Sequence, residues 1–401
     1  MIGSQFEVDV GPVAHGGHCV ARVEGQVVFV RHAIPGERVR IEITGESKRF
    51  LRADAIEVLT ASPLRVTPPC VYAGVCGGCD FQHVSLAGQR DLLGRVVREQ
   101  LQRLAGIEWD GEVEAVDETG LGWRTRVTFA TAESGALGLR KHRSHDVVEI
   151  DRCLIAHPGL PDVLAARWKA KSVEAIVSSA GETLVVVEEP HGAVPKVKSG
   201  GVVTAGGTRI RGKTSVTETA LDHEFRVSGS GFWQVHPASA STLVQAVLDG
   251  GQVSAGQTVA DLYAGVGLFT AFLADAAGET GAVFSVESDP AGARDARRNL
   301  HSFGSVKLVD LPVEEALREG ALGENIDVVV LDPPRTGAGK SVPLIAGLNA
   351  ERIVYVACDP AALARDLASF RAEGYRLEKL RAFALFPMTH HVECVAVLVR
   401  E

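Results

Sequence analysis

The chain has 401 residues and a formal net charge of -9, and 46% of its residues are hydrophobic against 23% charged. This length predicts two or three domains, and the composition is that of a folded soluble protein without an apolar run long enough to span a membrane. The first residues show no basic start followed by an apolar stretch, so we predict neither secretion nor organelle import and expect a cytoplasmic monomer.

The net negative charge argues against nucleic-acid binding by the surface as a whole, because basic side chains bind phosphate groups. A sum over the chain hides local patches, however. Basic residues cluster in three places that are either candidates for phosphate contacts or plain solvated faces: Lys48 with Arg49, residues 140–143, and Arg294 with Arg297 and Arg298.

Residues 1–60 alternate between apolar and polar side chains in short runs that turn residues separate. A period of two predicts strands, and several short strands in succession predict a small antiparallel β-barrel. The expected strands cover residues 6–10, 27–30, 39–43 and 55–59. A barrel of this size often binds oligonucleotides, but it can equally be a structural cap. A proline-rich stretch at residues 62–69 then indicates a linker.

Cysteines mark the second part of the chain, residues 61–230. Four of them form a C-x5-C-x2-C pattern with one distant addition: Cys70, Cys76, Cys79 and Cys153. In a long chain that we expect in the cytosol they do not predict disulfides, and their number suits either tetrahedral zinc or an iron-sulfur cluster. Cys19 and Cys394 have no assigned role. The predicted elements of this part are a helix at residues 87–104 and strands at residues 124–129 and 146–150.

From about residue 231 onward, apolar strands alternate with amphipathic segments, which predicts an α/β fold with a doubly wound, mostly parallel sheet. The expected strands cover residues 259–263, 282–286, 306–309, 328–331 and 353–356. Two further strands, at residues 377–385 and 392–399, are joined by a link too short for a parallel crossover. They should therefore form an antiparallel hairpin at the end of the sheet.

In such sheets ligands bind beyond the carboxyl ends of the parallel strands. The first strand is followed by Gly265 and Gly267, where a ligand can approach the backbone and the next helix. The second ends in Glu287, the usual place for a carboxylate that binds ribose hydroxyls. Since the glycines depart from G-x-G-x-x-G, the pattern favours an adenosyl ligand without a pyrophosphate over a dinucleotide.

The later strand ends carry reactive groups. Asp332 opens an Asp-Pro-Pro-Arg loop, Cys358 follows the fifth strand, and Glu393 begins the reversed last strand, which returns it to the same edge. Uracil C5 becomes nucleophilic when a thiolate adds at C6, and the adduct must then lose its C5 proton to a base. Cys358 and Glu393 can supply those two functions, whereas a buried structural thiol and a salt-bridged strand end are the alternatives.

In combination these motifs resemble those of the RNA 5-methyluridine (uracil-C5) methyltransferase family over nearly the whole chain. They are the four cysteines, Phe232-Trp233-Gln234, Asp261 to Gly267, Leu331 to Arg335, Cys358-Asp359-Pro360 and Glu393. The resemblance implies a TRAM barrel (OB-like) at residues 1–60, an iron-sulfur and RNA-binding region at 61–230, and a class I methyltransferase domain at 231–401.

The resemblance also implies roles for single residues. Cys358 would be the nucleophile and Glu393 the base, acting on a uridine of ribosomal or transfer RNA with S-adenosylmethionine as methyl donor. Contacts to the cofactor or target base are implied for Gln234, Tyr263, Gly265, Gly267, Glu287, Asp310 and Asp332. The four cysteines would hold a [4Fe-4S] cluster that has a structural or RNA-organising role. The chain departs from the family at His236, where Asn is common.

Two other functions stay open. A cytosine-C5 methyltransferase uses related covalent chemistry but typically has a Pro-Cys element in the loop after the fourth strand, where this chain has Asp332-Pro333-Pro334. An iron-sulfur RNA-binding protein or chaperone could keep the fold with an inactive methyltransferase domain, although both Cys358 and Glu393 are present. The sequence does not distinguish ribosomal from transfer RNA as the target.

Overall fold

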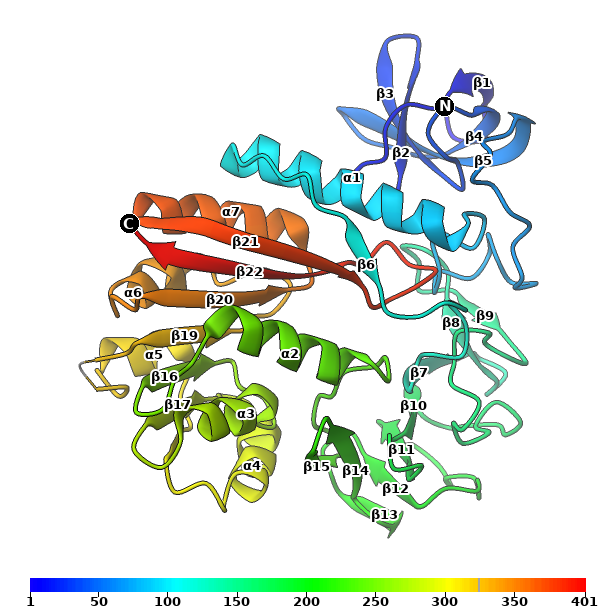
Figure 1. The fold of residues 1–401 in the computed structure, drawn as a ribbon. Coiled ribbons are helices and arrows are strands. Elements are labelled where there is room, and N and C mark those ends of the chain that lie inside the picture. The colour runs from blue at the N-terminus through cyan, green and yellow to red at the C-terminus, as the bar shows by residue number, and fades with distance from the viewer. Residues whose placement is uncertain (324) are drawn as a thin grey trace.

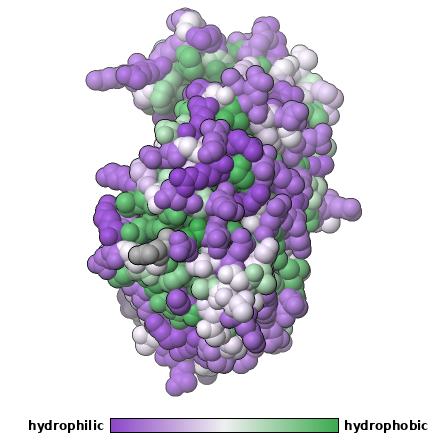
Figure 2. All heavy atoms as spheres, turned by 60° about the vertical axis from the view of Figure 1, so that its left-hand side comes forward, coloured by the Kyte–Doolittle hydropathy of each residue, from purple (hydrophilic) through white to green (hydrophobic). Residues whose placement is uncertain are grey.

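The computed structural model describes residues 1–323 and 325–401. Figure 1 shows the N-terminal strands at one end of the molecule, a green layer of central strands along one side, and a large sheet with helices on both faces. In the described residues the strands form sheets of five, seven, two and eight strands. The face turned forward in Figure 2 is mainly hydrophilic, with apolar side chains exposed in small areas.

The first sheet has the strand order β1-β4-β5-β3-β2, and contacts between β1 and β2 close it into a small barrel. Its strands are β1 (Gln5–Asp9), β2 (Cys19–Val23), β3 (Gln26–Arg31), β4 (Arg38–Glu46) and β5 (Phe50–Thr60). Alternate side chains fill its interior, among them the fully buried Val28, Ile41 and Leu51. The pairing of β3 with β5 is parallel, so the expectation of a purely antiparallel barrel was wrong at this pair.

Helix α1 (Leu86–Ala105) connects the barrel to the rest of the molecule. The Ser85 side chain caps its first turn by accepting a hydrogen bond from the N–H of Gly88, and Gly106, with φ 62°, ends it in the left-handed conformation. Its apolar stripe, which includes Leu92 and Val97, faces the core, and α1 packs against α7. The helix predicted at residues 87–104 is thus present within one residue at each end.

A second, central sheet has the order β13-β12-β11-β10-β7-β8-β9. Its strands are β7 (Arg126–Thr131), β8 (Leu137–Arg140), β9 (Val147–Glu149), β10 (Ser172–Val177), β11 (Thr183–Glu188), β12 (Gly201–Thr204) and β13 (Arg209–Gly212). A separate hairpin follows, β14 (Ser215–Ala220) and β15 (His223–Ser228).

The large C-terminal sheet has the order β18-β17-β16-β19-β20-β22-β21-β6. Its strands are β6 (Val113–Ala115), β16 (Thr258–Leu262), β17 (Ala282–Val286), β18 (Val306–Val309), β19 (Val328–Leu331), β20 (Arg352–Ala357), β21 (Tyr375–Ala384) and β22 (Glu393–Arg400). Strands β16 to β20 are parallel, and β22 is antiparallel to both β20 and β21. The doubly wound sheet and its antiparallel hairpin were therefore predicted correctly.

Helices cover both faces of this sheet (Figure 1). They are α2 (Ser239–Gly251), α3 (Leu268–Ala277), α4 (Pro290–Asn299), α5 (Val313–Arg318), α6 (Val342–Ala346), preceded by the 3-10 turn η1 (Gly339–Ser341), and α7 (Pro360–Ala372). No described helix is both long and apolar enough to cross a membrane.

Strand β6 joins the edge of the C-terminal sheet, parallel to β21. Together with α1 it belongs to the range 61–230, so the range expected for a central region also contributes to this sheet. One continuous apolar core includes Val39 of the barrel, Leu101 of α1 and Leu331 of the sheet. The barrel therefore shares one apolar core with the C-terminal sheet.

Candidate active site

The carboxyl ends of the parallel strands border a cavity of about 960 Å³. The predicted residues that line it come from the ends of β16, β17, β19 and β20, the start of β22 and the segment before α2: Gln234, Tyr263, Gly265, Glu287, Asp332, Cys358 and Glu393. These side chains are far apart in the sequence and meet because parallel strands end at one edge of a sheet.

Cys358 and Glu393 are brought together by strand register. Ala357 at the end of β20 pairs with Cys394 in β22, so Cys358 and Glu393 take the next positions along the two antiparallel strands. Cys358 is half-buried at the cavity and Glu393 is 5% exposed. Asp359 holds the turn after Cys358, because its side chain caps α7 by accepting from the N–H of Ala362 at 2.7 Å.

Negative charge is unfavourable at this end of the cavity. Burial, and then the Asp332 carboxylate, raise the pKa of Glu393 well above its usual range. Burial, with a contribution from Asp261, raises the pKa of Asp332 to about 7. Burial and then Glu393 raise the pKa of the Cys358 thiol to about 11, while Arg335 opposes that shift. Titratable groups whose pKa values are shifted in this way are common at sites of proton transfer and nucleophilic chemistry.

The ends of β16 and β17 form the neighbouring wall. Glu287 accepts hydrogen bonds from the N–H groups of Gly265 at 2.8 Å and Asp289 at 2.5 Å, so its carboxylate is fixed against the glycine turn. Tyr263 has φ 64°, a conformation that is rare for residues with a side chain, and its hydroxyl lies 3.4 Å from Ser341 Oγ. Tyr263, the turn at Gly265 and the fixed Glu287 carboxylate together line one polar part of the cavity. We call this part the polar slot, and its lining suits an adenosyl group.

Gly267 and Asp310 do not line the cavity in the described structure. Gly267 stands before α3 with φ 89°, and a Cβ there would lie 2.7 Å from Leu300 Cδ1, so this glycine permits helix packing behind the slot. Asp310 is exposed, and its carboxylate is 2.5 Å from the guanidinium of Arg297.

His236 also lies outside the lining. Its ring stacks on Trp123 at 5.8 Å between centroids and an interplanar angle of 28°, and its Nδ1 accepts from the N–H of Ala238. Trp123 itself lines the cavity. His236, where the chain departs from the family pattern, therefore packs against a residue of the cavity wall without lining the cavity itself.

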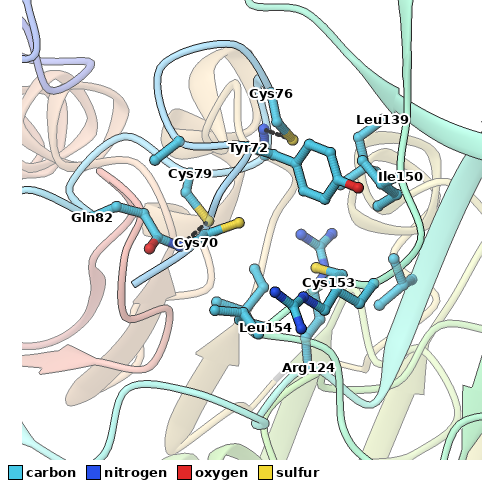
Figure 3. Close-up of a pocket in the computed structure, with 15 residues that line it drawn as sticks. Cys70, Tyr72, Cys76, Cys79, Gln82, Arg124, Leu139, Ile150, Cys153 and Leu154 are labelled. Atoms are coloured by element: carbon cyan, nitrogen blue, oxygen red, sulfur yellow. Dashed lines mark hydrogen bonds between the residues drawn. The ribbon is translucent and has the colours of Figure 1, made fainter. Parts of the chain in front are cut away.

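The four predicted ligand cysteines line a second, smaller cavity, which Figure 3 shows. Burial is the main cause that raises the pKa values of Cys76, Cys79 and Cys153, and neighbouring cysteines raise them further; the value for Cys79 is about 12. In residues 1–323 and 325–401, no group of three or more His, Cys, Asp or Glu side chains is arranged to hold a metal ion. Arg124 lines both this cavity and the larger one, so the two are neighbours.

A loop of the barrel reaches the sheet edge that carries Cys358. His15 Nε2 is 2.9 Å from the Asp359 carboxylate, next to Cys358. His390, in the link of the C-terminal hairpin, binds Asp80 of the cysteine segment through Nδ1 at 2.6 Å. The barrel, the cysteine segment and the C-terminal sheet thus meet around one cavity.

Several lining residues had no role in the sequence prediction. Phe232 and Arg335 stood inside recognised motifs, and Phe232 is 68% exposed at the cavity. Trp123, Arg124 and His391 carried no signal, because they belong to segments whose position depends on how the regions pack.

Residues 1–56 match the TRAM domain, and residues 212–401 match the family described as tRNA (Uracil-5-)-methyltransferase. An RNA methyltransferase of Streptomyces avermitilis is 48% identical over 99% of this chain and 98% of that protein. The 23S rRNA (uracil(1939)-C(5))-methyltransferase RlmD of Shewanella sp. (strain ANA-3) is 31% identical over 99% of this chain and 96% of its own length.

Among solved structures, the tRNA (uracil-54, C5)-methyltransferase of Pyrococcus abyssi in complex with S-adenosyl-L-homocysteine is similar with a TM-score of 0.74. The identity is 23%, and the match covers 98% of this chain and 99% of the other. This likeness shows the fold, a class I methyltransferase with an N-terminal TRAM domain, which confirms the predicted fold class.

Proposed function

The chain belongs to the tRNA (uracil-5-)-methyltransferase family and is an S-adenosylmethionine-dependent RNA methyltransferase, and from this premise we propose that it methylates C5 of a uridine through a covalent adduct with Cys358. The observation that carries the proposal is the position of Cys358 and Glu393 on paired strands beside one cavity. A thiol and a carboxyl on opposite strands can reach the two adjacent ring carbons at which the reaction needs them.

In this mechanism the Cys358 thiolate adds to C6 of uracil, which makes C5 nucleophilic. When bound, S-adenosylmethionine would supply the electrophilic methyl group, whose bond to sulfur breaks as the bond to C5 forms, and S-adenosylhomocysteine would leave. Glu393 then accepts the C5 proton, the C5–C6 double bond re-forms, and the carbon-sulfur bond breaks to return the thiolate. Arg335 assists the first step, because its positive charge lowers the cost of the thiolate.

The polar slot described above is our proposed site for the adenosyl group. Glu287, beside the glycine turn, would bind the ribose hydroxyls, and Tyr263 and Gln234 would lie along the ligand. Asp332 follows β19, which lies between β16 and β20 in the sheet, and its carboxyl would contact the methionine part or the target base. Phe232 offers an exposed aromatic face at the cavity for a base of RNA.

The direct test uses radiolabelled S-adenosylmethionine and cellular RNA from a strain that lacks the protein. Cys358→Ala should lose methylation by about 10³-fold or more, because no thiolate reaches C6. Glu393→Gln should still add and accept the methyl group, but a labelled protein-RNA adduct should accumulate in denaturing gels because the C5 proton is not removed. Mapping the modified base then decides between ribosomal and transfer RNA, and between uracil and cytosine.

The matched control is Cys394→Ala, which removes a buried thiol next to Glu393 that does not line the cavity. It should turn over like the wild type. A Cys358→Ala protein with normal turnover would refute the covalent mechanism. A Glu393→Gln protein that binds cofactor but never forms the adduct would leave the thiol as nucleophile and make Glu393 a residue that positions uracil.

We further propose that Cys70, Cys76, Cys79 and Cys153 hold a [4Fe-4S] cluster. The donor set fits in kind and number, and all four thiols line one cavity. Burial and mutual repulsion make the unliganded thiolates unfavourable, and bound iron would compensate for that cost. The cluster would tie the cysteine segment to Cys153 near the central sheet, without taking part in the methyl transfer.

Protein purified without oxygen should be brown and should contain about four iron atoms per chain. Cys153→Ala should lose the colour and the iron, whereas Cys19→Ala, which changes a buried thiol in the barrel, should keep both. A colourless, fully active wild type with about one zinc per chain would overturn the cluster assignment in favour of a tetrahedral metal site.

A further inference from the structure

A third cavity, of about 500 Å³, lies between the barrel and the loop that joins β8 to β9. Its basic and aromatic lining comes from both sides of this junction: His18, Phe29, Arg31 and Arg52 from the barrel, and Lys141, His142 and Arg143 from the loop. We call it the basic cavity. The methyl-transfer mechanism does not use any of these residues.

The basic cavity has more positive than negative charge. Two carboxylates line it, and each is already near a cation: Asp54 lies 3.7 Å from Arg31, and Asp146 lies 3.4 Å from Lys141. Within residues 1–323 and 325–401, Arg52 and Arg143 have no ion-pair partner. Burial, then Arg52 and Arg31, lower the pKa of Arg143. Guanidinium groups that repel one another would be stabilised by an anion between them.

Two imidazole rings of the basic cavity have unused hydrogen-bonding capacity. His18 is 8% exposed, its ring centroid is 5.4 Å from that of His142, and the buried Nε2 atom of each ring has no hydrogen-bond partner among the described residues. Burial lowers the pKa of His18 to about 4, so this ring is neutral at physiological pH. Buried polar atoms without partners are uncommon in folded proteins and point to a ligand that pairs with them.

The basic cavity adjoins the proposed active site. His142 lines both the basic cavity and the cavity that holds Cys358, so the two share a wall. The basic cavity also contains a half-buried phenyl ring, Phe29, and an apolar side chain, Val75, which is 54% exposed. Unpaired guanidinium groups beside an aromatic ring suit a phosphate followed by a nucleobase better than a free inorganic anion.

We propose that the basic cavity binds the phosphate and base of a nucleotide that flanks the target uridine, so that one RNA strand passes His142 from the active site to the barrel. Arg52 and Arg143 contact the phosphate, His18 and His142 supply further polar contacts, and Phe29 packs against the base. The inference rests on the proposed function, because it takes the substrate to be RNA.

The test measures binding of a fluorescent oligo(U) RNA of about 12 nucleotides, a length within the site sizes typical of single-strand binding proteins. The double variant Arg52→Ala/Arg143→Ala should bind about tenfold more weakly at fixed salt. The slope of log affinity against log salt concentration should fall by about 0.7 for each phosphate that the variant no longer neutralises. The variant Arg52→Lys/Arg143→Lys keeps the charges, and its affinity for oligo(U) should lie between those of wild type and the alanine variant.

The matched control is Arg22→Ala/Arg365→Ala, which removes two exposed charges outside both cavities. It should bind oligo(U) within about twofold of wild type. Calorimetric binding of S-adenosyl-L-homocysteine should be unchanged in every variant, which shows that the fold and the cofactor slot are intact.

An equal loss of affinity in the control pair would overturn the inference, because the effect would then be one of net charge. The inference would also be overturned if Arg52→Ala/Arg143→Ala bound oligo(U) with the affinity and salt slope of wild type. If the wild type still methylated cellular RNA, that result would leave the proposed function intact. A wild type that neither methylates RNA nor binds oligo(U) would remove the proposed function and this inference together.

Discussion

Glu393 lies where a carboxylate is costly, yet its proposed role requires the charged form. Burial and the nearby Asp332 favour the protonated carboxyl, and a charged Glu393 also raises the pKa of Cys358. The addition step therefore benefits from a neutral Glu393, whereas the final step needs it as a base. Glu393 must therefore release its proton to solvent before the final step, and its raised pKa then makes the carboxylate a stronger acceptor for the C5 proton.

This arrangement predicts a pH-dependent stability. Because the folded pKa of Glu393 is raised, the native state keeps a proton that the unfolded chain has lost, and stability falls as pH rises. The loss is at most about 1.4 kcal/mol per pH unit for one proton and stops where Glu393 ionises in the native protein. Glu393→Gln removes this dependence. Its urea midpoint should exceed that of wild type by a margin that grows as the pH rises above about 5 and that becomes constant where Glu393 ionises in the native protein.

Asp332 contributes a similar decline in both proteins, up to its pKa of about 7, so only the difference between them reports on Glu393. The control variant is Glu118→Gln, which changes an exposed carboxylate. Its urea midpoint should change with pH in parallel with that of wild type. Parallel curves for Glu393→Gln and wild type would show that the buried carboxyl is ionised in the native protein throughout this range.

At the scale of elements, the cysteine segment and the β8–β9 loop are in direct contact. The N–H of Gly77 donates to the carbonyl of Arg140 at 2.9 Å, and a Cβ on Gly77 would lie 2.7 Å from that oxygen and 2.7 Å from the backbone N of His142. Backbone on both sides leaves no room for a side chain. The segment with the cysteines therefore sets the position of the loop that carries His142 and Arg143.

Gly77→Ala should push the two segments apart. We expect a loss of about 1–3 kcal/mol in unfolding free energy and weaker oligo(U) binding. Gly78→Ala is the matched control, because a Cβ there would meet the end of the Leu139 side chain at 3.2 Å, which can move. Thermal unfolding and fluorescence titration measure both effects. If the two variants were equally stable, the close approach at Gly77 would not fix the loop.

The elements of the C-terminal sheet were predictable because strands of four to six apolar residues alternate there with amphipathic helices. The reversed direction of the last strand also allowed Glu393 to be placed beside Cys358 before the structure was known. No strand between residues 151 and 230 was predicted. In β11 the four central residues are all buried, so this strand lacks the period of two that identifies a strand with one exposed face. Strand β2 was missed too.

At the scale of the whole molecule, the cavity with Cys358 is a meeting point of regions far apart in sequence. The barrel contributes His15 beside Asp359, and the cysteine segment contributes Asp80 beside His390. Sequence patterns predict each region from its own periodicity, but contacts between regions depend on how finished layers pack. That is why Trp123 and Arg124 were missed, and why the basic cavity became apparent only in three dimensions.

The position of β22 has a consequence for how the enzyme is made. This strand is synthesised after every other element described, yet it lies between β20 and β21 and begins with Glu393. Until it is synthesised, β21 and β6 lack the strand that joins them to β20 and the rest of the sheet. A chain without β22 lacks Glu393 and the strand between β20 and β21, so under the proposed mechanism methylation would have to await residues 393–400.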